Sequence, residues 1–146
     1  MKPEERVLRF CDAMADWERR ALVALKTADS PESRKTAYDR LVAIFDEHLS
    51  EKGKRPSSFG QRLGGGPRLG GGSASEPPQY AQVLERVEGG RGGLVYVITR
   101  SAPGGMPNTR WRYAVRVDTA GECRIDDARA CIVGADGEEK WNLRLL

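Results

Sequence analysis

The spacing of the apolar residues changes its period once along the chain. From residue 3 to about residue 52 the apolar residues recur every three or four positions. Beyond residue 82 the apolar residues fall in short, mostly alternating runs. The first period is that of an amphipathic helix and the second is that of a strand. Helices that all precede the strands predict an α+β fold, not the alternating units of a parallel sheet.

Two helices are expected in the first part of the chain. The first spans residues 3–26, because Pro3 and the two glutamates after it suit a helix start. The second begins after Ser30, a suitable N-cap followed by Pro31, and ends near Gly53. Their apolar stripes consist of Val7, Phe10, Met14, Trp17, Ala21 and Leu25 in the first helix and Tyr38, Leu41, Val42, Phe45 and Leu49 in the second.

Five or six strands are expected in the second part of the chain. Short turns at Asp118–Gly121 and at residues 134–137 join neighbouring strands, so most pairings must be antiparallel. We therefore expect two N-terminal helices packed on one face of a strongly curved, mainly antiparallel sheet. The expected strands cover residues 83–87, 94–100, 110–117, 122–126, 129–133 and 138–145.

A glycine-rich segment at about residues 57–75 lies between the helices and the strands. It contains the unit Arg-Leu-Gly-Gly-Gly twice, and such a run buries too little surface to offset the entropy of ordering it. The sequence context of a phosphate-binding loop is missing, and two arginines without aromatic neighbours are a weak signal for RNA binding. We expect a flexible loop within one domain that spans residues 1–146 and has one core.

Charge and cysteine content narrow the function classes. The net charge is +3, and the excess lies between residues 51 and 76, so the remainder lacks the broad basic surface of a nucleic-acid binder. The first ten residues carry charges, and apolar runs such as residues 94–98 are too short to span a membrane, so a cytoplasmic location is expected. Three cysteines without C-x-x-C spacing and one histidine indicate no disulfide framework, metal site or cofactor.

Two groups of residues are candidates for catalysis, and neither is favoured. Strand alternation would place Asp126 and Asp127 on opposite faces of the sheet, which predicts strand-ending aspartates in place of a catalytic pair. His48 falls on the apolar side of the second helix, near its C-terminal end, where the helix dipole favours a protonated imidazole. Without a partnered nucleophile, an interfacial histidine is the simpler interpretation, and no catalytic residue is predicted.

The aromatic residues are interpreted mainly as core. Trp17, Trp111 and Trp141 are each in register with an apolar face, where large aromatics usually anchor a core and only rarely stack on a ligand. A cavity beneath the helices remains an alternative, with the hydroxyl groups of three tyrosines at its edge. Those tyrosines are Tyr80, Tyr96 and Tyr113.

The polar face of the sheet carries the candidate binding residues. Arg110, Arg112 and Arg116 share one side of a strand, and Arg124 lies on the same side of the next. A solvated face explains this arrangement without a partner. The alternative is a protein-binding surface, because guanidinium groups suit bidentate pairing with carboxylates of another protein.

The order of several short motifs resembles the nuclear transport factor 2-like fold immunity proteins of bacterial polymorphic toxin systems. These motifs are a helix with a central Trp17, a second helix ending in AIFDEHL, then PPQY, a strand ending in Thr99, RYAV, GECRID and a terminal GEEKWNLRLL. The resemblance covers nearly the whole chain. The chain differs from the family in Cys123, where an aromatic residue is expected, and in the doubled glycine unit.

The resemblance implies a conical α+β domain and a protein that is not an enzyme. Its expected role is to bind a cognate toxin domain and to neutralise it by occlusion, so that the producing cell and its kin survive. The same fold houses isomerases and dehydratases that use cavity carboxylates, so a small-molecule-binding or cavity enzyme is the alternative. A homodimer that uses the sheet face is a third interpretation. Neither nucleic acid nor membrane is an expected partner.

Overall fold

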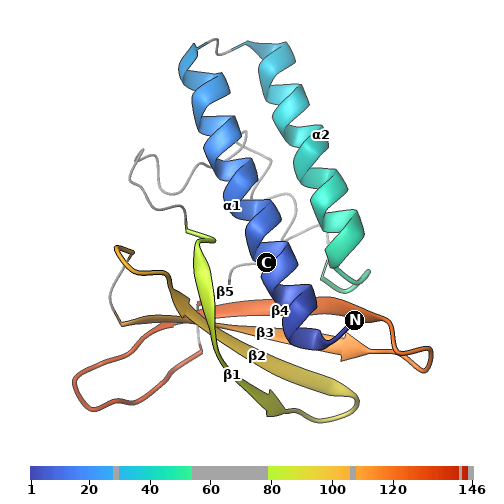
Figure 1. The fold of residues 1–146 in the computed structure, drawn as a ribbon, viewed down its shortest axis with the longest axis vertical. Coiled ribbons are helices and arrows are strands. Elements are labelled where there is room, and N and C mark those ends of the chain that lie inside the picture. Colours follow the sequence, from blue (N-terminus) through green and yellow to red (C-terminus); the bar gives the residue numbers. More distant parts are fainter. Residues whose placement is uncertain (28–29, 54–78, 106–107, 142, 145–146) are drawn as a thin grey trace.

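Two helices pack on one face of an antiparallel sheet (Figure 1). The computed structural model describes residues 1–27, 30–53, 79–105, 108–141 and 143–144. The expected α+β arrangement, with both helices before the sheet, is confirmed. The predicted glycine-rich loop at residues 57–75 lies outside the described residues.

The two helices form where their apolar stripes and capping residues predict them. Helix α1 spans Pro3–Thr27 and helix α2 spans Pro31–His48. The hydroxyl of Ser30 accepts a hydrogen bond from the backbone N–H of Ser33 at 3.1 Å, so the predicted N-cap is confirmed. Helix α2 ends earlier than predicted, because Leu49 leaves the helix in an extended conformation and forms a parallel bridge with Ile125.

The strands follow one another in the sheet in chain order. They are β1 (Gln82–Gly89), β2 (Leu94–Ser101), β3 (Thr109–Val117), β4 (Cys123–Ile132) and β5 (Leu143–Arg144). All four pairings are antiparallel, as predicted. The strands predicted separately at residues 122–126 and 129–133 are one strand, β4. Within the described residues, the last strand covers Leu143–Arg144.

Two irregularities in strand pairing bend the sheet. The register shifts in β1 between Leu84 and Arg86, and it shifts again in the pairing of β3 with β4 at Ala114 and Val115. An extra residue on one strand bends that strand and increases its twist. The sheet is therefore strongly curved, as predicted, and its long strands curl beneath the helices without closing into a barrel (Figure 1).

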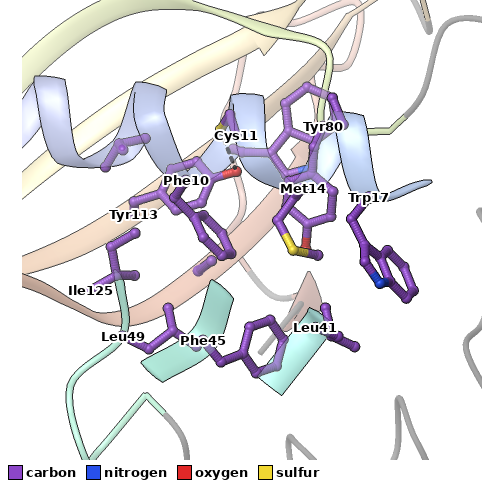
Figure 2. Packing of buried hydrophobic residues seen from close by; sticks show 14 of the residues in the cluster. Phe10, Cys11, Met14, Trp17, Leu41, Phe45, Leu49, Tyr80, Tyr113 and Ile125 are labelled. Atoms are coloured by element: carbon purple, nitrogen blue, oxygen red, sulfur yellow. Dashed lines mark hydrogen bonds between the residues drawn. The ribbon is translucent and has the colours of Figure 1, made fainter. Parts of the chain in front are cut away.

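Aromatic and aliphatic side chains fill the space between the helices and the sheet (Figure 2). The ring of Phe10 meets the rings of Tyr80 and Tyr113 edge-on, with centroids 5.7 and 6.2 Å apart. Trp17 and Trp111 are buried in this core, as predicted. Trp141 is only partly buried and lies on the other side of the sheet, beside Arg112.

Among the described residues, neither helix has the length and apolar character needed to cross a membrane.

Candidate functional site

The face of the sheet opposite the helices, called the outer face below, carries the predicted arginines. Side chains on β3 alternate between buried and more exposed positions, which places Arg110, Arg112 and Arg116 on the outer face. Arg116 is the cross-strand partner of Arg124, so Arg124 lies on the same face of β4. The structure thus brings the four predicted binding residues onto one surface.

Three of these four arginines are already paired within the protein. Arg110 forms an ion pair with Glu85 on β1 at 2.7 Å. Arg116 forms one with Asp126 at 2.8 Å. Arg124 lies 3.6 Å from the carboxylate of Glu122 and donates hydrogen bonds to the carbonyl oxygens at the C-terminal end of α2, which belong to Asp46 and Glu47. These contacts restrict the three guanidinium groups, and that of Arg124 lies against the C-terminal end of α2.

Arg112 is held by aromatic rings and has no carboxylate partner among the described residues. Its guanidinium carbon lies 4.6 Å from the centroid of the Tyr96 ring and 5.3 Å from that of Trp141. Both distances are within the range of a cation–π interaction. The aromatic contacts restrict the side chain without satisfying its N–H donors.

A hollow of about 210 Å³ opens on the outer face beside Arg112. It is bounded by side chains from β2, β3 and β4 and by the segment after α2. We call it the Arg112 hollow; its lining residues are Lys52, Leu94, Tyr96, Arg112, Ala114, Asp126, Asp127 and Arg129.

The irregularity in β4 changes the predicted positions of the two aspartates. Ile125 pairs with Val115 while Asp127 pairs with Ala114, so Asp126 is the extra residue of a bulge. Simple alternation, which predicted that Asp126 and Asp127 lie on opposite faces and end a strand, is therefore wrong. Both residues line the Arg112 hollow, and β4 continues to Ile132.

Each aspartate in the hollow has its own cationic partner. Asp126 is buried, with 3% of its surface exposed, and accepts hydrogen bonds from Ser50 Oγ at 2.6 Å and Arg116 Nε at 2.8 Å. Asp127 accepts from Arg129 Nε at 2.8 Å and from the backbone N–H of Ala128 at 3.0 Å. The two carboxylates therefore serve as counter-ions within the protein in the described arrangement.

The segment after α2 docks against the bulge. Ser50 donates its backbone N–H to the carbonyl oxygen of Ile125 at 3.0 Å, and its hydroxyl accepts from the backbone N–H of Gly53 at 3.1 Å. Gly53 is buried, and a Cβ atom at this position would overlap the Ile125 carbonyl oxygen. This close approach requires glycine, and it fixes one rim of the hollow.

Arg6 joins the start of α1 to the end of α2 and to β4, and the sequence analysis did not single it out. Its Nε donates to the carbonyl oxygen of Cys123 at 2.9 Å, and its Nη1 donates to His48 Nδ1 at 3.1 Å and to the carbonyl oxygen of Glu47 at 3.3 Å. Its Nη2 lies 3.3 Å from the carboxylate of Glu122. A sequence signal was present, because Arg6 stands four residues before Phe10 at the edge of the apolar stripe.

His48 is buried at the end of α2, as predicted, but its protonation is not favoured. Burial lowers its pKa below the usual 6.5, and the neighbouring Arg6 lowers the pKa further, although Glu47 opposes this. Since Nδ1 accepts a hydrogen bond from Arg6, the ring is neutral with its proton on Nε2. Desolvation therefore outweighs the helix dipole that suggested a protonated ring.

A polar network lies on the inner side of the sheet, within the core. Gln82 Oε1 accepts hydrogen bonds from Thr99 Oγ1 at 2.6 Å and from the hydroxyl of Tyr113 at 2.7 Å, and Cys11 Sγ lies 3.5 Å away. Burial raises the pKa of Cys11 to about 12 and raises that of Tyr113 well above 10, so both keep their protons.

The tyrosines do not gather at one cavity edge. Tyr80 and Tyr113 are almost completely buried in the core, whereas Tyr96 lies on the outer face, so the alternative prediction that placed all three around one cavity is wrong. Within the described part of the chain, no group of three or more histidine, cysteine, aspartate or glutamate side chains could hold a metal ion.

Comparison of the chain with protein-family models, with curated proteins and with solved structures gave no match. The fold class therefore rests on the structure itself. It is an α+β arrangement of two N-terminal helices on a curled antiparallel sheet, and it is compatible with a nuclear transport factor 2-like fold.

Proposed function

We propose that this protein is an immunity protein that binds a cognate bacterial toxin domain and neutralises it by occlusion. The observation that carries the proposal is the outer face, where four arginines stand on neighbouring strands at positions fixed by ion pairs and aromatic rings. The resemblance of the motif order to immunity proteins and the compatible fold support the same function. In this role the protein acts in the cytoplasm of the producing cell.

Fixed arginines suit a surface that must recognise a protein partner tightly. A guanidinium that is already held in place loses less conformational freedom when it pairs with a carboxylate of the partner. An inhibitor that acts at cellular concentrations needs nanomolar affinity, about −12 kcal/mol, and at least ~1,200 Å² of buried surface. A few arginine or aromatic anchors commonly supply most of that free energy.

A second candidate is a small-molecule-binding or cavity enzyme of the same fold, favoured by the presence of Asp126 and Asp127 in one hollow. In the described arrangement both carboxylates are engaged by arginines, which leaves them poorly placed to transfer protons. Asp127→Asn separates the two candidates, because an acid–base role requires the carboxylate whereas occlusion of a toxin does not. Full toxin protection by this variant supports the immunity function.

The proposal is tested by co-expression with the C-terminal domain of a large secreted protein encoded by the neighbouring gene. The protein is expected to restore growth of a bacterial host that produces this domain, and the two purified proteins are expected to form a stable complex. Growth arrest that persists despite soluble expression of both proteins would overturn the proposed function. A stable dimer of the protein alone, without binding of the domain, would favour the homodimer interpretation.

The contact surface is tested with the double variant Arg110→Gln and Arg112→Gln. We expect at least ~10-fold weaker binding, about 1.4 kcal/mol, with a larger loss at low salt because exposed charges are screened. The matched control is Arg19→Gln with Arg40→Gln, which removes the same charge from exposed positions on the helices. A folded double variant that binds the toxin as tightly as the control shows that the outer face is not the interface.

A further inference from the structure

The Arg112 hollow presents N–H donors that no carboxylate of the described residues occupies. The rings of Tyr96 and Trp141 contact the guanidinium at centroid distances of 4.6 and 5.3 Å. Contacts of this kind engage the flat face of a guanidinium and leave its edge, which carries the N–H groups, able to form a fork with an anion. The guanidinium of Arg112 is therefore held in one orientation, in which it can bind an anion.

A second arginine stands opposite Arg112 on the neighbouring strand. Arg112 on β3 is the cross-strand partner of Arg129 on β4, and both line the hollow. Like charges at directly opposed positions of neighbouring strands destabilise a sheet. Asp127 offsets part of this repulsion through Arg129 Nε, at 2.8 Å. An anion bound beside Arg112 would offset the remaining repulsion between Arg112 and Arg129.

The charge of the lining favours a monoanion. The hollow is lined by three cationic side chains, Lys52, Arg112 and Arg129, and by two anionic ones, Asp126 and Asp127, and Arg116 pairs with Asp126 from beside it. A phosphate group, with close to two negative charges, would meet stronger repulsion from the two aspartates than a carboxylate would. A planar carboxylate also matches the geometry of the guanidinium fork.

The volume of the hollow suits a single side chain better than a larger ligand. Its volume of about 210 Å³ is below the roughly 300–1,000 Å³ typical of pockets that enclose drug-sized molecules. We infer that the Arg112 hollow is a subsite for one carboxylate, supplied by an aspartate or glutamate side chain of the protein partner. This inference rests on the proposed function for the identity of the partner, and it makes Arg112 the central anchor among the four arginines.

The subsite can be tested on the full chain without the toxin. The probe is the peptide acetyl-Gly-Glu-Gly-amide, compared with its glutamine analogue, with acetate and with inorganic phosphate at equal ionic strength. Nuclear magnetic resonance follows the Arg112 Nε–H and the Trp141 indole N–H signals. We expect saturable shifts of both signals with the glutamate peptide and no saturable shift with the glutamine peptide.

Two substitutions establish that Arg112 is responsible. Arg112→Gln is expected to weaken binding of the glutamate peptide at least ~10-fold. Arg112→Lys is expected to weaken it as well, since it keeps the charge and loses the fork. Arg19→Gln, which removes an exposed charge on α1, should bind as the unmodified protein does. An unchanged thermal unfolding midpoint of the Arg112→Lys variant would exclude loss of fold as the cause of its weaker binding.

Three outcomes would overturn the inference: equal shifts with the glutamate and glutamine peptides, unchanged binding after Arg112→Gln, or tighter binding of acetate or phosphate than of the glutamate peptide. The last outcome would identify a small anion as the occupant. A negative titration and a negative growth assay have different consequences. A negative titration removes the subsite while protection persists, whereas loss of protection removes the proposed function without altering the titration.

Discussion

Replacement of Gly53 by alanine tests how tightly the end of α2 is joined to the β4 bulge. The new Cβ would overlap the carbonyl oxygen of Ile125 and approach Leu49 Cβ to 3.3 Å. Because the first of these obstacles is backbone, the segment itself must move. Overpacking of this kind costs about 1–3 kcal/mol, and the two hydrogen bonds of the Ser50 hydroxyl, to Gly53 and to Asp126, contribute about 1 kcal/mol each. The free energy of unfolding should therefore fall by about 3–5 kcal/mol.

Urea denaturation at equilibrium measures this change, with Gly89→Ala as the matched control. No atom lies within 4 Å of a Cβ built on Gly89, and its backbone is not in the left-handed region, so the control should change stability by less than about 0.5 kcal/mol. Equal stability of the two variants would show that the segment accommodates the methyl group freely. The reasoning about the docked rim of the hollow would then be refuted.

Two further predictions concern buried polar groups. Tyr113→Phe removes one of the hydrogen bonds to Gln82 Oε1 and should lower the free energy of unfolding by about 1 kcal/mol, measured in urea; an unchanged midpoint would contradict this. The pKa of His48 is held below 6.5 in the folded protein. Between pH 6.5 and this lower pKa, the unfolded chain therefore binds more protons than the folded protein does. Stability is therefore retained above about pH 6.5 and lost as the pH falls towards the folded pKa. Urea midpoints between about pH 7.5 and pH 5 should show this loss, and a parallel loss in His48→Gln would exclude His48 as its source.

The elements with strong local patterns were predictable from the sequence. The stripe that contains Phe10 and the cap at Ser30 predicted the helices, and the alternation along β3 predicted which face carries Arg112. Each of these signals is contained within one element, so no knowledge of its neighbours is needed. The antiparallel pairing followed in the same way from short turns such as that of Asp118–Gly121, which closes with a hydrogen bond from Gly121 N to Asp118 O at 3.0 Å.

The candidate hollow was not predictable, because it depends on contacts between distant segments. A bulge at Asp126 depends on how β4 pairs with β3, and alternation within one strand contains no information about an extra residue. The adjacent acidic residues resembled a strand end for that reason. The aromatic partners of Arg112 come from β2 and from the chain beyond β4, so only the folded structure brings Tyr96 and Trp141 to the same side chain.

The contacts of Arg6 set an order of events during synthesis. Its guanidinium bonds to groups at residues 47 and 48 and to the carbonyl oxygen of Cys123, which is 117 positions further along the chain. From the end of α2 at His48 to Cys123 the ribosome adds 75 residues, which takes on the order of 4 to 15 seconds at the usual rate of elongation. Both helical segments are therefore synthesised well before the strand whose carbonyl oxygen accepts a hydrogen bond from Arg6. The core of this protein can close only after β4 has been made, so a chain cut short within the sheet lacks part of the surface that buries the apolar stripes of the two helices.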